Sequence, residues 1–239
     1  LTALKGRMGT LLLDPRNVTI SGAATSNGTL SGCPGSTFTP SGDSAVLNVT
    51  SLTTNLATCN VTVQTSGGGT QDGNLTISSA ISWSASTTLT LTADSYIAFN
   101  ASVSCSGNAF SAGAYALVAT AGLANSSSPS GASLNIANGV SIDMSAGNGG
   151  ISLTGDASAA STGANQAVGV QFVTSAFVKT STGPITIVGK AGTSNNNYQL
   201  GIALAGSLTN NLIRTTSGSI TLTGTGGSSA TGGVQGMEG

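Results

Sequence analysis

A repeated block between Gly150 and Gly239 constrains this chain more than any other feature of its sequence. The leading isoleucines of its copies, Ile151, Ile185 and Ile220, are 34 and then 35 residues apart. A constant period in this range is typical of a solenoid. Three short strips recur in the same order: 151–154 returns at 185–188 and 220–223, 169–172 at 201–204 and 233–236, and 177–180 at 212–215.

Each strip alternates aliphatic and polar residues. In Ile220-Thr221-Leu222 the two aliphatic side chains lie on one face of a strand and the threonine on the other. One such strand cannot bury its apolar face alone, whereas stacking each strip on its copy makes a parallel sheet with a continuous interior. Three strips per repeat predict a three-sided parallel β-helix. An antiparallel β-sandwich of short strands is the alternative, and the constant order of the strips favours the solenoid.

The repeat also predicts which side chains stack and which are buried. Ile151, Ile185 and Ile220 should lie over one another, roughly 4.8 Å apart per coil. The second strip predicts a similar ladder of Val170, Ile202 and Val234. The predicted core is Val61, Val63, Leu75, Ile77, Leu89, Leu91, Ile151, Leu153, Ile185, Ile187, Ile220 and Leu222, with the intervening threonines facing outward.

The first part of the chain is less regular than the repeats. Apolar strips begin at Val61, Leu75 and Leu89, 14 residues apart. Residues 21–44 contain Asn-Gly, Pro-Gly and Pro turn signals and are predicted to be a loop excursion. Residues 102–132 look loop-rich, with one apolar strip at 115–118. No linker divides the chain. We therefore expect a single β-helix domain over 1–239, with irregular coils over 1–149 and regular repeats of about 34 residues over 150–239.

Charge and hydropathy exclude several classes of partner. Only 5% of the residues are charged and the net charge is −1, so the chain lacks the basic surface that binds nucleic acid or anionic membranes. It has no run of about 18 apolar residues that would span a bilayer. It opens on Leu1 without a methionine and stops inside a repeat, and we expect it to be a piece of a longer or processed protein.

The residues that could carry chemistry are few. The chain has no histidine, which excludes Ser-His-Asp and Cys-His nucleophiles. Paired carboxylates could still cleave sugars, but several of the aspartates stand at predicted turns, where aspartate is an ordinary residue. The sequence therefore predicts no catalytic residue, no cofactor and no metal site. The carboxylates considered are Asp14, Asp43, Asp72, Asp94, Asp143 and Asp156.

The three cysteines leave two interpretations open. Cys33, Cys59 and Cys105 form no Cys-x-x-Cys pair, and no histidine could complete a zinc site. They are either three small buried apolar residues or one disulfide and one thiol. In a secreted protein, a Cys33–Cys59 bridge would tie the loop at 31–42 to the body of the domain. Cys105 would then be a candidate for an intermolecular link.

Two stretches of the first hundred residues resemble a known family. Leu11-Leu12-Leu13-Asp14-Pro15-Arg16-Asn17-Val18-Thr19-Ile20, together with the run 56–65 and the strips 73–77 and 80–85, is similar to large bacterial exoproteins of the filamentous haemagglutinin type, which are secreted by the two-partner route. The motifs cover about residues 9–100, and residues 133–239 match in repeat style only. Cys59 stands where glycine is expected. The resemblance implies a right-handed parallel β-helix, a secreted or cell-surface location and adhesive or filamentous roles, without a catalytic site.

The outward threonines suggest a second function. In Thr88-Leu89-Thr90-Leu91-Thr92, three threonines share one face, an arrangement that resembles ice-binding solenoids. Threonine is also a strong β-former, and neighbouring threonines stabilise a sheet. The uneven connecting segments suit a flat, lattice-matching face poorly.

We therefore expect a structural or adhesive extracellular protein. Its expected partners are further coils of the same parent chain or end-to-end copies in a fibre, together with host or cell-surface glycans. An ice- or carbohydrate-binding β-solenoid is the alternative, and a polysaccharide-cleaving β-helix enzyme is a weaker one.

Overall fold

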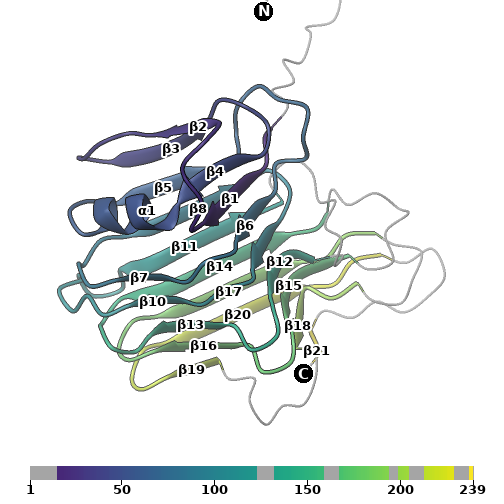
Figure 1. Cartoon of the computed structure of the whole chain (residues 1–239). Coiled ribbons are helices and arrows are strands. Elements are labelled where there is room, and N and C mark those ends of the chain that lie inside the picture. Colours follow the sequence, from purple (N-terminus) through teal and green to yellow (C-terminus); the bar gives the residue numbers. More distant parts are fainter. Residues whose placement is uncertain are drawn as a thin grey trace, which may run out of the picture.

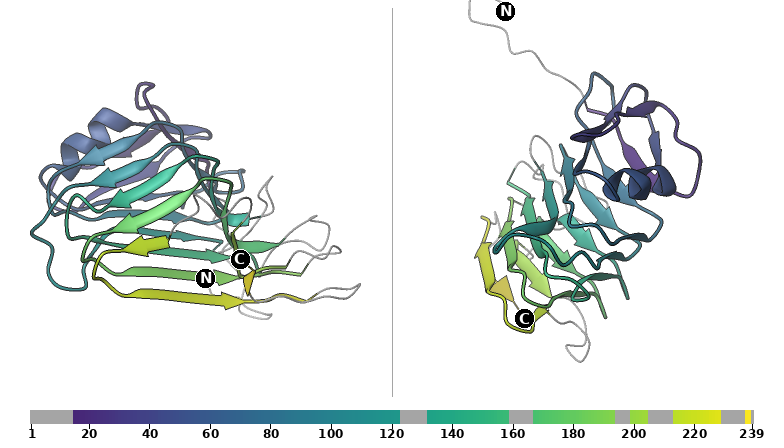
Figure 2. Two further views of the ribbon diagram at one scale, coloured as in Figure 1. Left: turned by 90° about the horizontal axis from the view of Figure 1, so that it is seen from below. Right: turned by 90° about the vertical axis from the view of Figure 1, so that its left-hand side faces the viewer.

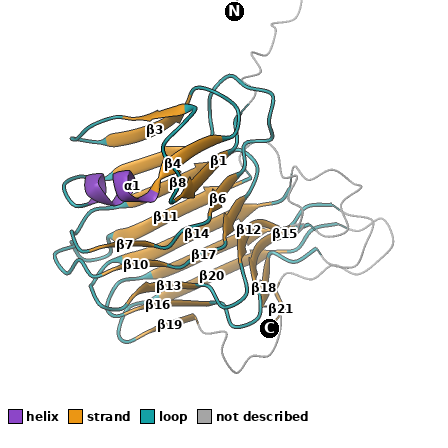
Figure 3. Cartoon of the chain, viewed as in Figure 1, coloured by secondary structure: helices purple, strands orange, loops and turns teal. Residues whose placement is uncertain are grey.

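The computed structural model describes residues 15–122, 132–158, 167–193, 199–204, 213–228 and 237–238. Over these residues the chain is β-structure with one helix, α1 (Val49–Leu56). The strands form three sheets that face a common interior (Figures 1 and 3). Within these ranges, no helix is long and apolar enough to cross a membrane.

The three sheets, here named A, B and C, are given in their spatial order. Sheet A contains β21 (Met237–Glu238), β18 (Ile202–Leu204), β15 (Val168–Phe172), β12 (Ala132–Ile136), β9 (Ile97–Phe99), β6 (Leu75–Ile77), β1 (Val18–Ser21) and β4 (Ala45–Asn48). Sheet B contains β2 (Gly28–Leu30), β3 (Ser36–Pro40), β5 (Val61–Gln64), β8 (Leu89–Ala93), β11 (Tyr115–Ala121), β14 (Gly150–Asp156), β17 (Ile185–Lys190) and β20 (Ile220–Thr225). Sheet C contains β19 (Ile213–Thr215), β16 (Phe177–Thr180), β13 (Ser141–Met144), β10 (Val103–Cys105) and β7 (Ile81–Trp83).

The chain visits the sheets in rotation. From β5 onward it contributes one strand to sheet B, one to sheet A and one to sheet C, and each strand pairs in parallel with the strand three places later. We call one such round a coil. Among the described strands, only β2 and β3 pair antiparallel. This parallel, all-β architecture is compatible with the predicted solenoid.

The predicted isoleucine ladder is confirmed. Ile151 pairs with Ile185, and Ile185 pairs with Ile220, in one unbroken register of sheet B. In sheet A, Val170 pairs with Ile202 as predicted. Val234 lies outside the described residues, and the partner of Ile202 in the next coil is Met237. The second strip of the last repeat therefore pairs three residues later than its sequence suggested.

Burial alternates along the strands as the pattern predicted. The predicted core residues from Val61 to Ile187 are all buried, and the threonines between them are partly exposed. Two expectations are wrong, because Ile220 is 43% exposed and Leu222 is only partly buried. Both lie on β20, the last strand of sheet B, whereas an inward side chain is fully covered only when coils pack on both sides of it.

The glycine near the end of the sheet B strand in each repeat is required for a steric reason. Gly155 and Gly189 hold equivalent places at the ends of β14 and β17. A Cβ at Gly155 would overlap the backbone oxygen of Gly169, and one at Gly189 would overlap that of Gly201. Only glycine lets the end of a sheet B strand approach sheet A this closely.

Coil length changes along the molecule. In sheet B, Val61 pairs with Leu89, Leu89 with Leu117 and Leu117 with Ile151, which are steps of 28, 28 and 34 residues. The 14-residue rhythm of the sequence is therefore half a coil, because Leu75 belongs to sheet A.

The N-terminal part contains elements that the sequence did not predict. Residues 21–44 are more than a loop excursion, because they contain the hairpin of β2 and β3. Helix α1 follows β4 directly. Residues 102–132 contain β10, which was not predicted, and the long strand β11, which begins at the apolar strip 115–118.

Candidate functional site

The hairpin β2–β3, strand β4 and helix α1 together cover one end of the sheets (Figure 1). We call these elements, residues 28–56, the N-terminal cap. Strands β2 and β4 end sheets B and A, and α1 packs against β7, which ends sheet C.

Helix α1 is specified by a capping asparagine and two buried leucines. The side-chain oxygen of Asn48 accepts hydrogen bonds from the backbone N–H groups of Thr50 (3.0 Å) and Ser51 (3.1 Å), and asparagine is among the preferred N-cap residues. Leu52 and Leu56, one turn apart, are fully buried. The spacing from Asn48 to Leu52 and Leu56 is the sequence signal that could have predicted this helix.

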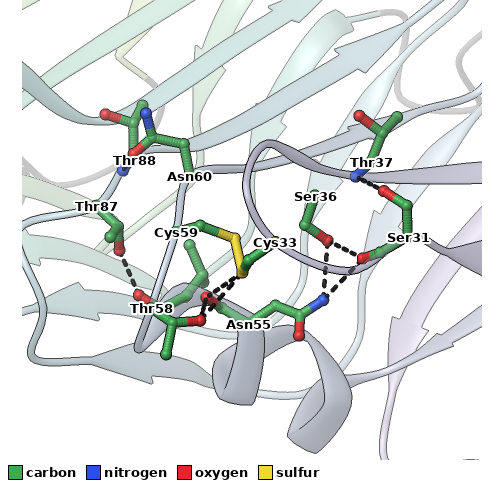
Figure 4. The surroundings of a disulfide bond; sticks show 11 residues. Ser31, Cys33, Ser36, Thr37, Asn55, Thr58, Cys59, Asn60, Thr87 and Thr88 are labelled. Carbon is green, nitrogen blue, oxygen red and sulfur yellow. Dashed lines mark hydrogen bonds between the residues drawn. A yellow bond between two sulfur atoms is a disulfide. The ribbon is translucent and has the colours of Figure 1, made fainter.

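A disulfide attaches the hairpin to the helix (Figure 4). Cys33, in the loop between β2 and β3, is bonded to Cys59, just after α1, with a Cα–Cα distance of 5.8 Å. Beside it, the amide of Asn55 donates hydrogen bonds to the Ser31 carbonyl (3.1 Å) and the Ser36 hydroxyl (2.8 Å). The cap is therefore closed by one covalent bond and a polar network.

An open groove of about 480 Å³ lies between β2 and α1. Its walls carry hydroxyl and amide groups and no charge. These groups can donate and accept hydrogen bonds, but none of them titrates near neutral pH. The polar side chains that line it are Thr25, Thr29, Ser31, Ser51, Thr54 and Asn55.

The remaining cysteine is inside the protein. Cys105 is a free thiol, 2% exposed, on β10 of sheet C. Burial raises the pKa of this thiol above its ordinary value, so the reactive thiolate is suppressed. Because its thiol is buried, Cys105 is poorly placed to form the intermolecular link that we expected.

Four of the six candidate carboxylates each have a different partner. Asp14 lies outside the described residues, and Asp72 contributes, after burial, to a raised pKa of Tyr96. In the part of the chain that the structure describes, no group of three or more His, Cys, Asp or Glu residues could hold a metal ion. The pairings are Asp43 with Arg16 (3.7 Å), Asp94 with the hydroxyl of Thr65 (2.8 Å), Asp143 with Lys179 (3.8 Å) and Asp156 with Lys190 (3.4 Å).

Two of these ion pairs join successive coils. Asp143 and Lys179 stand opposite each other in sheet C, as do Asp156 and Lys190 in sheet B. Burial alone would raise the pKa of Asp156, but the hydrogen bonds from Ser158 and the charge of Lys190 outweigh it and hold that pKa below its ordinary value. These carboxylates act as links between coils.

The outer face of sheet B carries two rows of side chains. In each row, one residue from every strand lies beside its counterpart on the next strand. Row one is Thr62, Thr90, Val118, Ser152, Thr186 and Thr221; row two is Gln64, Thr92, Thr120, Thr154, Val188 and Thr223.

Comparison with known proteins identifies no relative of this chain. No protein-family model, curated protein or solved structure matches the chain. Its function is therefore inferred below from its own residues and geometry.

Proposed function

We propose that this chain is a segment of a secreted, haemagglutinin-like exoprotein, with a structural and adhesive role at the cell surface. Its three sheets would form the sides of a right-handed, three-sided parallel β-helix. The observation that supports this best is the constant register from coil to coil, in which Ile151, Ile185 and Ile220 follow one another in sheet B. Such a stack is suited to extending over a long distance.

The contacts between coils support a mechanical role. In a parallel sheet the backbone hydrogen bonds lie between neighbouring strands, so here they run along the direction in which coils stack. Ion pairs reinforce two of these steps, between Asp143 and Lys179 and between Asp156 and Lys190. A pull along the stacking direction would be shared among the many ladder bonds of each coil.

The surface and the disulfide support an extracellular, adhesive role. Charged residues make up only 5% of the chain, so the coat consists largely of hydroxyl, amide and glycine surface that can hydrogen-bond to glycans. Disulfides persist in oxidising compartments, which agrees with the Cys33–Cys59 bond. Host or cell-surface glycans are the partners that we propose for this coat.

The two ends of the sheets suggest different contacts. The N-terminal cap covers one end, whereas β20 at the other end presents the exposed side chain of Ile220. An uncovered strand edge is a template for another strand. We therefore propose a further coil of the same kind at this edge rather than a symmetric end-to-end fibre, because the opposite end consists of a hairpin, a strand and a helix instead of a regular coil.

The shape and the binding can be tested on the purified chain. Negative-stain micrographs and fibre diffraction should show rods with a repeat of roughly 4.8 Å along their axis. Aligned fibres without this repeat would reject the β-helix. Binding to glycan arrays and to cultured cells tests adhesion, with heat-unfolded chain as the control. Adhesion is rejected if the folded chain binds neither.

The proposed location can be tested on material isolated from its natural source. Thiol titration after unfolding should find one reactive thiol without reductant and three with it, because Cys33 and Cys59 are bonded and Cys105 is free. Three thiols without reductant would remove the support for an oxidising compartment.

A further inference from the structure

The outer face of sheet B differs chemically from the outer faces of the other sheets. On β5, β8, β11, β14, β17 and β20, rows one and two contain nine Ser or Thr residues, two Val and one Gln among 12 positions, with no charge. The next outward position after row two holds Asp156 on β14 and Lys190 on β17, which form an ion pair at the edge of this face. The outward row of sheet C runs Ser82, Ser104, Asp143, Lys179 and Arg214. The corresponding row of sheet A runs Val46, Thr19, Thr76, Ala98, Asn135 and Gln171 and ends at Ala203, which is buried.

This difference is not explained by β-propensity. Threonine favours strands in general, and all three sheets are built from parallel strands of the same coils. Propensity alone would spread threonine over the three faces. Its concentration in two adjacent rows of sheet B points to a property of that face.

The rows stay aligned although the coils differ in length. The step from coil to coil grows from 28 to 34 residues between Leu89 and Ile151, yet every row position keeps its partner. One register shift occurs, between Tyr115 and Leu117, and it precedes the row positions of β11. The uneven connecting segments therefore do not disturb this face, contrary to the expectation from sequence. Figure 2 shows the strands of sheet B side by side in two further views.

The two rows form a two-dimensional array of groups. Neighbouring strands lie about 4.8 Å apart, and alternate residues of one strand lie roughly 6.6 Å apart. Threonine has a stiff χ1 angle, so its hydroxyl and methyl groups are held in place before binding. Each hydroxyl both donates and accepts hydrogen bonds. Val118 and Val188 keep the branched shape of threonine without the hydroxyl.

A ligand that matches such a face repeats in two directions, is uncharged, and offers both donors and acceptors at each point. We propose that the outer face of sheet B binds the surface of ice. Water molecules in ice donate and accept hydrogen bonds, and their oxygens repeat at distances of similar size in two directions. Many weak contacts on a rigid lattice add up to firm binding.

A polysaccharide fits this face less well. Sugar rings are commonly held by exposed aromatic rings with several amide or carboxylate groups around them. The aromatic residue that the structure places here is Tyr115, whose hydroxyl is engaged with that of Thr186 at 3.0 Å, and Gln64 is the one amide in the two rows. Ice binding does not depend on the adhesive role proposed above.

The test measures how the purified chain partitions between slowly growing ice and the remaining liquid. Thr154→Tyr places a bulky ring in the middle of row two and should lower the partition roughly tenfold or more, the equivalent of losing one or two hydrogen-bonded contacts. Thr154→Val keeps the shape and should lower it less. Ser104→Tyr puts the same ring on the outer face of sheet C and should leave it unchanged. Circular dichroism and thermal melting confirm that each variant folds.

Several outcomes would overturn the proposal. Exclusion of the unmodified chain from ice would do so, as would equal losses in Thr154→Tyr and Ser104→Tyr. Retention on insoluble cellulose or chitin together with exclusion from ice would assign the face to a sugar lattice instead. If Thr154→Tyr does not fold, Thr120→Lys, one strand away in the same row, is interpreted in the same way.

Discussion

The N-terminal cap and the repeats from β14 to β20 bury apolar side chains by different means. The cap uses devices close to one another in space: a helix with its own capping residue, an antiparallel hairpin and the Cys33–Cys59 disulfide. The repeats use like residues in successive coils, such as Ile151 and Ile185. The cap can therefore end a sheet, whereas each repeat needs a neighbour on both sides.

The two ends of sheet B show the consequence. Ile185 and Ile220 have the same place in the repeat and pair directly, but the first is fully buried and the second is 43% exposed. Phe38, on a cap strand near the opposite end, is fully buried. Position along the stack, as well as residue type, thus decides how much each apolar side chain stabilises the fold.

The largest effect is expected from a charge in the repeat core. Ile187→Asp places a carboxylate among buried aliphatic side chains and should cost several kcal/mol of unfolding free energy. Ile220→Asp should cost much less, because Ile220 is already partly in water. Denaturant unfolding measures both. The outward Val188→Asp is the control, and the strand register is wrong if it costs as much as Ile187→Asp.

Removing the disulfide should destabilise the N-terminal cap more than the repeats. Cys33 and Cys59 are 26 residues apart, and a loop of this length predicts a stabilisation of about 3.5 kcal/mol. In the Cys33→Ser/Cys59→Ser variant, hydrogen exchange should accelerate in β2 and α1 and stay slow in β14 and β17. Equal acceleration in both regions would show that the cap and the repeats unfold as one cooperative unit.

Removing the side chain of Asn48, which caps the N-terminus of helix α1, should also destabilise this region, but by less. Asn48→Ala deletes the acceptor for the N–H groups of Thr50 and Ser51 and should cost about 1 kcal/mol. Exchange should accelerate mainly in α1 and in the segment around residues 22–23, whose carbonyls also accept hydrogen bonds from Asn48. Thr54→Ala, within the same helix, is the matched control, and a larger loss in that variant would show that the Asn48 bonds do not specify the helix.

The smallest effect is expected from an ion pair between coils. Lys190→Ala should lower stability by no more than a few tenths of a kcal/mol, because both side chains are substantially exposed. The folded pKa of Asp156 lies below its ordinary value of 3.8. The contribution of the pair is therefore present above that value and lost as pH falls through the lower, folded pKa. Melting curves of both proteins at neutral pH and near pH 2 should differ only at neutral pH.

Much of the regular half was predictable because its signals are local. Alternation with a period of two assigns inward and outward residues within a strand, and the 34- and 35-residue spacing of the isoleucines predicted their pairing, which is confirmed. The cap was missed. Asn48, Leu52 and Leu56 form a short helical pattern within a chain otherwise rich in strands, and β2 and β3 are set among turn signals.

The candidate functional surfaces were only partly predictable. The sequence indicated outward threonines, and the alternation of Thr90 and Thr92 with buried leucines bears this out. The predicted stacking of the repeats implied aligned outward residues on the last three of these strands, but it did not extend the two rows to β5, β8 and β11. The sequence offered the Cys33–Cys59 bridge as one of two interpretations, and the structure contains that disulfide.

The sequence by itself determined the strand character of the repeats, the alternation between core and surface, and the stacking of Ile151, Ile185 and Ile220. These follow from period and residue type, which are properties of short segments. Only the tertiary structure decided that Leu52 is covered, that Ile220 is open, and that threonines from coils of 28 and 34 residues share one face. These outcomes depend on contacts between residues about one coil apart in the chain, and connecting segments of different length lead to the same register because strand pairing fixes it.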